Sequence, residues 1–340
     1  MSPLRVHGRG PPVTTSRLAA MLACLAIGAT TTACGLLAGV DWDRVAASGD
    51  GGNGGNGGSS GTTGGPSDPS PPGLSGIRDL SIDGDAACVV RDNGTLACFG
   101  GVPPPPAGTF RAVSVSDGYG NCAIAEDGTL QCWGGDATEG TATDHPPAGG
   151  GITAVRVGAV PCVLQNGRIV CWGKDRPADA AMASFAGTVW AELGGPYDIC
   201  AVSNIGDIRC FESKPSIARG RGLASSGVDN CILDLASSKP ACWSTDGSAA
   251  FGQPLPPPDE PLRSIALGAP GVGCGIRMDD SVKCWATRQL GATVGPDPSI
   301  LTAVPSGAFR KVAVGQYFGC AIRTSGELVC WGPHARLVGP

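Results

Sequence analysis

Cysteines are the residues of this chain most capable of chemistry, and 14 of its 16 cysteines form seven pairs at nearly constant spacing. The pairs are Cys88 with Cys98, Cys122 with Cys132, Cys162 with Cys171, Cys200 with Cys210, Cys231 with Cys242, Cys274 with Cys284, and Cys320 with Cys330. The chain has no Cys-x-x-Cys and only three histidines, which argues against a zinc site or a thioredoxin-like redox role. The pairs therefore favour disulfides, and the alternative is that they are reduced, buried cysteines acting as small apolar residues.

The segment between the two members of a pair has the pattern of a β-hairpin. When Cys320 is placed opposite Cys330, the loop is Thr324-Ser325-Gly326, and its last residue needs a left-handed backbone that glycine adopts at low cost. Directly opposed residues of two antiparallel strands lie within disulfide range, so we expect one disulfide within each hairpin. Four other pairs give three-residue loops of this kind: Asp92-Asn93-Gly94, Glu126-Asp127-Gly128, Asn204-Ile205-Gly206 and Met278-Asp279-Asp280.

Two pairs have irregular spacing, and they test this interpretation. Cys162 and Cys171 are one residue closer, which leaves the two-residue loop Asn166-Gly167, a strong hairpin signal. Cys231 and Cys242 are one residue further apart, which leaves the four-residue loop 235–238. The loop length changes while the cysteines stay opposed, as expected of cross-strand partners.

Each hairpin belongs to a longer repeat. A strand-like alternation precedes each of several pairs, as in Phe110-Arg-Ala-Val-Ser-Val and Phe309-Arg-Lys-Val-Ala-Val. Six intervals separate Cys88 from Cys320, so the repeat is about 39 residues long, which is typical of a propeller blade with several strands. An aromatic residue follows the second cysteine of every pair: Phe99, Trp133, Trp172, Phe211, Trp243, Trp285 and Trp331. We expect these aromatics to pack between blades, and the alternative is a carbohydrate-binding ring.

The motif Phe-Arg-x-Val-x-Val-Gly…Cys-Ala-Ile-x-x-(Asp/Ser)-Gly-x-Leu-x-Cys-Trp-Gly resembles the regulator of chromosome condensation repeat, in the bacterial extracellular variety with paired cysteines. The resemblance covers residues 74–340 and is weakest around Cys200 and Cys231. It implies an all-β, seven-bladed β-propeller. The histidine that often precedes the first cysteine in this family is replaced here by other residues. The link segments could supply a fourth strand, and residues 335–339 are expected to close the ring beside residues 77–82.

The N-terminus has the pattern of an export signal. Arg5, Arg9 and Arg17 precede an apolar run too short for a confident membrane span. Thr31-Thr32-Ala33-Cys34-Gly35 resembles a bacterial lipoprotein cleavage site, in which Cys34 becomes lipidated; Thr31 stands where that family usually has leucine, so conventional cleavage is the alternative. The domains expected are a signal peptide at 1–33, a flexible Gly/Ser/Pro-rich tether at 34–73 and the propeller at 74–340. This predicts a lipid-anchored protein of the bacterial cell envelope facing an oxidising compartment, or a fully secreted one.

The charge balance and the motifs exclude several classes of function. After removal of residues 1–33 the chain has 21 basic and 29 acidic side chains, a net charge of −8, which argues against nucleic-acid binding. No catalytic, cofactor-binding or metal-binding motif is present, so we expect no enzyme activity and no cofactor. The acidic turn residues Asp92, Glu126, Asp127, Asp279 and Asp280 could form a calcium-binding or catalytic ring, but such residues more often satisfy turn backbone.

The leading functional hypothesis is a binding module. A monomeric, tethered propeller would present variable link segments, such as 101–109, 135–151 and 174–189, to an unknown extracellular protein or glycan. One alternative is inhibition of an extracellular enzyme, because the repeat resembles that of a secreted propeller-type β-lactamase inhibitor; this predicts a patch of exposed aromatics on one face. Another is a hydrolase or lyase with a polar cluster at the central channel. Nucleotide exchange on a small GTPase, the family's eukaryotic role, is disfavoured by export.

Overall fold

The structure is a computed structural model, and it describes residues 74–135, 142–178, 181–195, 198–227, 229–244, 255–268, 271–287 and 298–335. The expected signal peptide, the tether and Cys34 lie outside the described residues, so those expectations stay predictions.

The described chain forms seven antiparallel sheets of three strands each, as the sequence predicts for a seven-bladed propeller. Blades 1 to 3 are β1 (Ile77–Asp83), β2 (Ala86–Arg91) and β3 (Leu96–Phe99); β4 (Phe110–Ser116), β5 (Gly120–Ala125) and β6 (Leu130–Trp133); and β7 (Ile152–Arg156), β8 (Cys162–Gln165) and β9 (Arg168–Cys171). Blades 4 and 5 are β10 (Trp190–Gly194), β11 (Cys200–Ser203) and β12 (Ile208–Cys210), then β13 (Gly220–Ser226), β14 (Asp229–Asp234) and β15 (Pro240–Ser244). Blades 6 and 7 are β16 (Leu262–Gly268), β17 (Val272–Arg277) and β18 (Val282–Ala286), then β19 (Phe309–Val314), β20 (Gly319–Arg323) and β21 (Leu328–Trp331).

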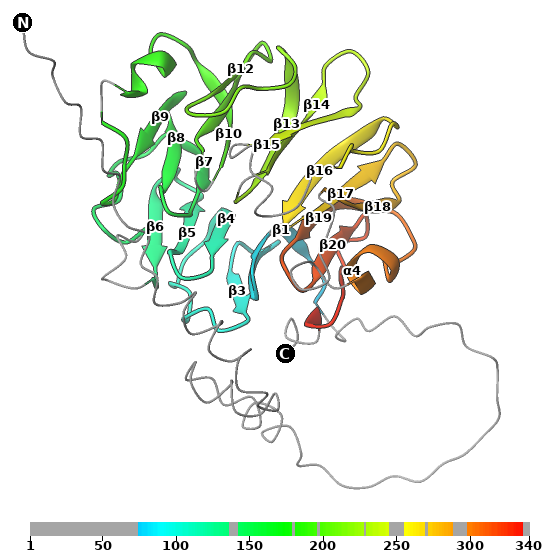
Figure 1. Ribbon diagram of the computed structural model, residues 1–340. Coiled ribbons are helices and arrows are strands. Elements are labelled where there is room, and N and C mark those ends of the chain that lie inside the picture. Colours follow the sequence, from blue (N-terminus) through cyan, green and yellow to red (C-terminus); the bar gives the residue numbers. More distant parts are fainter. Residues whose placement is uncertain are drawn as a thin grey trace, which may run out of the picture. The chain divides into compact units, whose positions relative to one another are not determined.

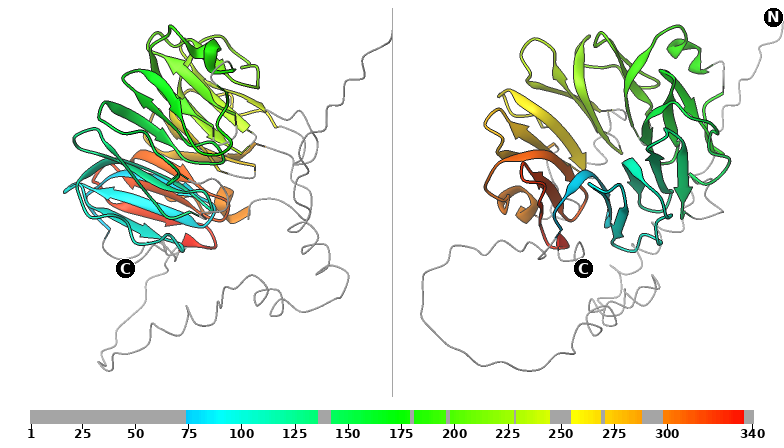
Figure 2. Two further views of the ribbon diagram at one scale, coloured as in Figure 1. Left: turned by 90° about the vertical axis from the view of Figure 1, so that its left-hand side faces the viewer. Right: turned by 180° about the vertical axis from the view of Figure 1, so that it is seen from behind.

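The first strand of every blade is the innermost one, and the seven inner strands stand side by side around a central channel (Figure 1; Figure 2). The links contain a 3-10 helix, Ala181–Phe185, before blade 4 and a short helix α4, Pro298–Thr302, before blade 7. In the described parts of the links no fourth strand joins a sheet.

Each hairpin contains one disulfide, with the pairing that the spacing predicts. The bonds join Cys88 to Cys98, Cys122 to Cys132, Cys162 to Cys171, Cys200 to Cys210, Cys231 to Cys242, Cys274 to Cys284 and Cys320 to Cys330. The two cysteines are direct cross-strand partners in all seven hairpins, the shorter and the longer one included. Their Cα atoms are 4.0 to 4.1 Å apart. Seven disulfides indicate that the protein resides in an oxidising, extracellular type of environment.

The disulfides are also part of the packing between blades. Cys98 is partly buried against the cluster between blades 1 and 2, and Cys284 is buried in the cluster between blades 6 and 7. The alternative of reduced cysteines acting as small apolar residues is therefore wrong about their oxidation state and agrees with the structure about their packing. The cysteines are packed as apolar residues, but they are oxidised in pairs.

The residue that ends each hairpin loop has a left-handed backbone and also links its blade to the next one. Glycine fills this position in blades 1 to 4 and 7, while Ser238, with φ of 57°, and Asp280, with φ of 69°, fill it in blades 5 and 6. Its carbonyl accepts a hydrogen bond from the first residue of the following inner strand. The pairs are Phe110 N–H to Gly94 O, Ile152 to Gly128, Trp190 to Gly167, Gly220 to Gly206, Leu262 to Ser238, Phe309 to Asp280 and Ile77 to Gly326, at 2.8 to 3.1 Å.

Seven hydrophobic clusters fill the spaces between adjacent blades, one for each interface. The aromatic residue after the second cysteine lies in the cluster shared with the preceding blade; Trp133, for example, packs with Ala86 and Cys88 of β2. Several indole N–H groups also anchor the link before their own blade, as Trp172 does by donating to the carbonyl of Ala142 at 2.8 Å. The aromatics at this register therefore serve as core residues rather than as an exposed ring.

Blade 7 meets blade 1 through the same contacts that join the other blades. Leu328 N–H also donates to the carbonyl of Leu74 at 2.9 Å, which binds the start of the propeller to the last strand. The closing segment expected at 335–339 is described only at Ala335, which is buried in the cluster between blades 7 and 1. Residues 336–340 lie outside the described chain.

Candidate functional site

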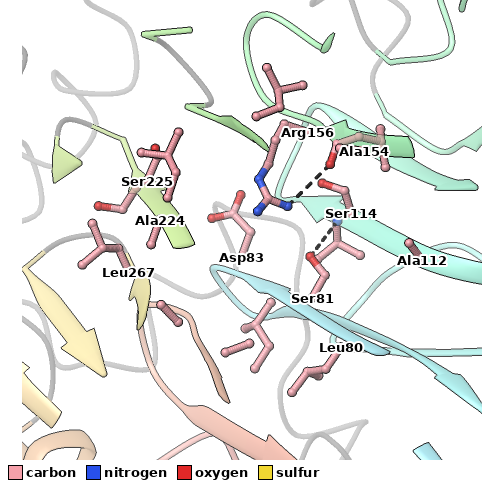
Figure 3. Close-up of a pocket in the computed structure, with 18 of the residues that line it drawn as sticks. Leu80, Ser81, Asp83, Ala112, Ser114, Ala154, Arg156, Ala224, Ser225 and Leu267 are labelled. Carbon is pink, nitrogen blue, oxygen red and sulfur yellow. Dashed lines mark hydrogen bonds between the residues drawn. The ribbon is translucent and has the colours of Figure 1, made fainter. Parts of the chain in front are cut away.

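The central channel is the first candidate site. Its volume is about 620 Å³, and residues of all seven inner strands line it. Figure 3 shows that small side chains such as Ala112 and Ala224 leave room, while Arg156 extends into the space between the strands. The polar side chains of the wall come from different blades, so ring closure alone brings them together.

Acidic and hydroxyl side chains line the wall because the inner strands have a free edge. The N–H groups on that edge have no partner strand, and buried N–H groups need an acceptor. At the joints after blades 1, 2 and 4, side chains of the preceding blade supply this acceptor. Asp79 accepts from Val113 N–H at 3.0 Å and Ser81 accepts from Val115 N–H at 3.1 Å. Ser114 does the same for Val157 at 3.1 Å. These polar residues are thus part of the joint between blades.

Glu192 joins blades 4 and 5 in the same way. Its two carboxylate oxygens accept hydrogen bonds from the N–H groups of Gly222 at 3.0 Å and Leu223 at 2.7 Å. Asp79 is further compensated by an ion pair with Lys311 of blade 7. Two of the carboxylates of the channel are therefore already bound by the protein itself.

Asp83 and Arg156 experience the enclosed channel in opposite ways. Burial raises the pKa of the Asp83 carboxyl above its usual value, and hydrogen bonds from Asp117 N–H and the Ser116 hydroxyl partly offset that effect. Enclosure lowers the pKa of Arg156, while the negative charges of Asp79 and Glu192 act in the opposite direction. A guanidinium stays protonated under all ordinary conditions, so Arg156 carries a full positive charge. Its side chain contacts the solvent of the channel.

Bulged arginines join the blades beside the channel. Every inner strand shifts register near its second or third residue. Arg78, Arg111 and Arg310 occupy the unpaired position and donate to the first carbonyl of the next inner strand: Phe110, Ile152 and Ile77, respectively. A bulge redirects a side chain, which explains why the Phe-Arg motif recurs.

The channel holds little of what catalysis requires. In its described wall no serine or cysteine lies beside a histidine, and the carboxylates there bind backbone N–H groups. The described residues contain one group of potential metal ligands, Asp198 with Cys200 and Cys210, and its ligand atoms are already engaged with other groups of the protein. Its two cysteines form a disulfide, and Asp198 accepts from the N–H groups of Glu212 and Ser213. This cluster is structural.

The second candidate site is the face of the propeller that carries the hairpin turns, called here the hairpin face. Four large apolar side chains are exposed on it: Val189 at 60%, Ile205 at 59%, Leu235 at 41% and Met278 at 53%. Ile205, Leu235 and Met278 belong to the turns of blades 4, 5 and 6, and Val189 lies directly before β10. We call these four residues the apolar arc.

Backbone and side-chain contacts connect the members of the apolar arc. Asn204 N–H donates to the carbonyl of Val189, and Arg263 donates to the carbonyl of Met278 at 3.1 Å. Arg221 lies between the turns of blades 5 and 6, where it donates to the Ser238 hydroxyl at 3.0 Å. Within the described chain Arg221 forms no ion pair, whereas Arg263 is paired with Asp280 at 2.9 Å. The arc thus carries an uncompensated positive charge.

Blades 1, 2 and 7 present polar residues at the same turn position. Asn93, Asp127 and Ser325 stand where Ile205 stands in blade 4. Asp127 accepts from the hydroxyl of Thr129 at 2.7 Å and from its N–H at 2.9 Å, and Asp279 accepts from the hydroxyl of Ser281 at 2.6 Å and from its N–H at 3.0 Å. These bonds, those from the hydroxyls most of all, lower the pKa of both carboxyls. Asp127 and Asp279 therefore satisfy local backbone, as the alternative to a calcium or catalytic ring predicts, while Glu126 pairs with Arg78 and Asp280 with Arg263.

Sequence reasoning named the central channel, as the place of a hydrolase or lyase site, but identified none of the residues that line it, and it missed the apolar arc, although each site has a signal in the aligned repeats. Arg156 stands at the register where Ser81 and Ser114 supply acceptors, and Ile205 and Met278 are apolar residues in turns that are otherwise polar. The patch of exposed aromatics that an inhibitor would present is absent from the described residues, whose large exposed apolar side chains are aliphatic or methionine. The link segments expected to bind a partner contribute Val189 to the hairpin face.

The fold and part of the sequence match known proteins. Residues 309–332 match the family described as the regulator of chromosome condensation (RCC1) repeat. The CRINKLY WD40 ectodomain of the Arabidopsis thaliana receptor kinase ACR4 is 23% identical, with a TM-score of 0.57 over 76% of this chain and 95% of that one. The ectodomain of the Physcomitrella patens receptor kinase CR4 is 18% identical, with a TM-score of 0.57 over 76% of this chain and 72% of that one.

At these identities the structural likeness establishes the fold. Among the described residues no helix is both long and apolar enough to span a membrane. The seven disulfides are typical of an oxidising environment. The chain is a seven-bladed β-propeller whose last blade matches the regulator of chromosome condensation repeat.

Proposed function

We propose that this propeller is a protein-binding module of the bacterial cell envelope, held to a membrane by a lipid on Cys34 and a flexible tether. It uses the apolar arc of the hairpin face to bind a protein segment that carries apolar side chains and an acidic residue. The observation that carries this proposal is the exposure of four large apolar side chains on neighbouring blades.

Apolar side chains gathered on one surface favour a protein partner. Single exposed apolar residues are ordinary, but a contiguous group rimmed by polar side chains marks an interaction surface. Aliphatic and methionine side chains suit a protein segment, because methionine adapts its shape to its contacts. Glycan binding would instead use exposed aromatic rings, and the aromatics at the repeat register are core residues.

Charge narrows the chemistry of the partner. Arg221 is exposed beside the arc and forms no ion pair in the described chain, and guanidinium binds carboxylates with two parallel hydrogen bonds. An acidic residue in the partner would compensate it. The net charge of the whole chain is −5, so the unpaired positive charge of Arg221 differs in sign from the charge of the chain as a whole.

A photo-crosslinking amino acid placed at position 205 or 278 tests this surface in cells that express the full chain. We expect both positions to form an adduct with the same protein, and an added Ile205→Asp change to abolish the adduct formed from position 278. The matched controls are positions 93 and 325, which occupy the same turn in blades 1 and 7. Equal labelling from the control positions, or capture of a glycan polymer instead of a protein, would contradict the proposal.

A further inference from the structure

We infer that the central channel binds a small oxyanion, such as a carboxylate or phosphate group of a small molecule, at the guanidinium of Arg156. The site is separate from the apolar arc, because it lies among the inner strands and not at the hairpin turns. It follows from the unpaired guanidinium of Arg156 and from the blade joint beside which this side chain lies.

The joint between blades 3 and 4 lacks the side-chain acceptors that are seen at the joints after blades 1, 2 and 4. At the equivalent register, Asp79 and Ser81 of blade 1 accept from the inner strand of blade 2, and Ser114 of blade 2 accepts from blade 3. In blade 3 these two positions hold Ala154 and Arg156, and neither side chain can accept a hydrogen bond. The free edge of β10 therefore faces an apolar methyl group and a second donor.

Arg156 itself has no strong partner. Its one hydrogen bond is to the carbonyl of Val155 at 3.5 Å, and it forms no ion pair with any described residue. The nearby carboxylates are occupied, since Asp79 binds Lys311 and Val113 N–H, and Glu192 binds the N–H groups of Gly222 and Leu223. A guanidinium can form two parallel hydrogen bonds to one carboxylate or phosphate, and Arg156 is free to do so.

Two hydroxyl groups of the same channel also lack partners. The hydroxyl oxygens of Ser225 and Ser264 are enclosed and form no hydrogen bond in the described chain. Ser225 lies beside Gly194 of β10, because a Cβ added at that glycine would come within 2.6 Å of the hydroxyl oxygen. Figure 3 shows Arg156 and Ser225 on opposite sides of the space. Both hydroxyl oxygens have almost no exposed surface, so the group that a ligand in the channel can reach is the guanidinium of Arg156.

The channel is large enough for such a ligand and nearly balanced in charge. Its volume of about 620 Å³ falls within the range of small-molecule sites. Three acidic side chains (Asp79, Asp83 and Glu192) and three basic ones (Arg156, Arg310 and Lys311) line it. Arg310 and Lys311 are engaged with blade 1, which leaves Arg156 as the cation able to bind a ligand.

Equilibrium dialysis of the disulfide-bonded protein against labelled inorganic phosphate and, in a second arm, labelled acetate tests the inference. We expect saturable binding of at least one of the two at one site per chain. Arg156→Gln should weaken that binding about 10- to 100-fold, the effect of losing a hydrogen-bonded charge. Arg156→Lys should retain part of the affinity, because it keeps the charge and loses the two-pronged geometry.

The matched control is Arg168→Gln, which removes the same charge from an exposed position on the same blade and should leave binding unchanged. Intact disulfides and an unchanged circular dichroism spectrum establish that each variant is folded. Failure of both anions to bind the folded wild-type protein, or equal binding by Arg156→Gln, would overturn the inference. The crosslinking experiment on the apolar arc is independent of both results.

Discussion

Arg156 and Asp83 lie in the same channel, and enclosure favours the neutral form of each side chain. It lowers the pKa of Arg156 and raises the pKa of Asp83. The consequences differ. Arg156 keeps its charge, because its pKa starts far above any ordinary pH. The carboxyl of Asp83 changes its charge at an accessible pH, so its raised pKa changes the dependence of the free energy of unfolding on pH. A folded state that raises the pKa of a carboxyl binds a proton more tightly than the unfolded chain does, and it loses relative stability as pH rises.

Asp83→Asn should remove this effect. In the wild-type protein the contribution of Asp83 to the free energy of unfolding falls as pH rises from 3.8 through the raised pKa, and each tenfold difference in proton affinity corresponds to about 1.4 kcal/mol. The amide oxygen of asparagine can still accept from Ser116 and Asp117 N–H, so the fold is retained. Denaturant titrations of both proteins from acidic to neutral pH measure the difference, which should move in favour of Asp83→Asn toward neutral pH.

Asp175→Asn is the control, because it removes an exposed carboxyl from a link segment. Parallel pH profiles for wild-type protein and Asp83→Asn would show that burial of Asp83 has no energetic consequence.

At the scale of elements, each hairpin contains a disulfide and also forms a hydrogen bond to the next blade. Its disulfide holds two short strands together, and its turn carbonyl receives the N–H of the next inner strand. Strands as short as β12, Ile208–Cys210, form few ladder bonds, so a covalent link matters more here than in a longer sheet. The disulfides thus maintain the turn geometry on which the neighbouring blade depends.

Replacing both Cys122 and Cys132 with alanine tests this role. The change should lower the free energy of unfolding by about 2–3 kcal/mol, the entropic effect of opening a loop of this length. Loss of the buried sulfur atoms adds to it, because Cys122 is fully buried between blades 2 and 3. Denaturant titration gives the size of the effect, and the wild-type protein in reducing agent serves as the reference. An unchanged midpoint, or disulfides between different hairpins in non-reducing peptide maps, would contradict the scheme.

At the scale of the whole molecule, the sequence predicts what repeats and misses what varies between repeats. The pairing of Cys162 with Cys171 and of Cys231 with Cys242 followed from loop length alone, because opposed residues on two strands must stay opposed. The surroundings of the Arg156 side chain could not be predicted from the sequence of blade 3 alone. Its surroundings come from residues of blades 1 and 4, which meet only when the ring closes.

Apolar turn residues were missed for a different reason. Ile205 and Met278 sit in hairpin loops whose backbone is predictable, but turn chemistry says nothing about whether such a side chain is covered by a neighbouring link. The role of Arg78 and Arg310 was missed because a bulge cannot be inferred from alternation of apolar residues.

The proposed attachment to a membrane concerns the full chain, and Cys34→Ser tests it. We expect wild-type protein in the membrane fraction and labelled by a fatty acid, whereas Cys34→Ser should be released and unlabelled. Each buried CH₂ of an acyl chain contributes about 0.8 kcal/mol to membrane binding, so loss of the lipid should abolish partitioning. Cys24→Ser should behave like wild type. Membrane association that survives in Cys34→Ser would contradict the anchor.

The joint between blades 7 and 1 has the turn-carbonyl bond that is found at the other six joints, and the bulged-arginine bond found after blades 1 and 2. Ile77 N–H binds Gly326 as Phe110 N–H binds Gly94, and Arg310 reaches Ile77 as Arg78 reaches Phe110. These two hydrogen bonds therefore do not distinguish the joint between blades 7 and 1 from joints that a link spans. New termini placed in the link between blades 1 and 2, with the old ends joined, should give the same ring from a circularly permuted chain. The order of the blades around the axis is what the fold requires, and the point at which the polypeptide starts is free to change in evolution.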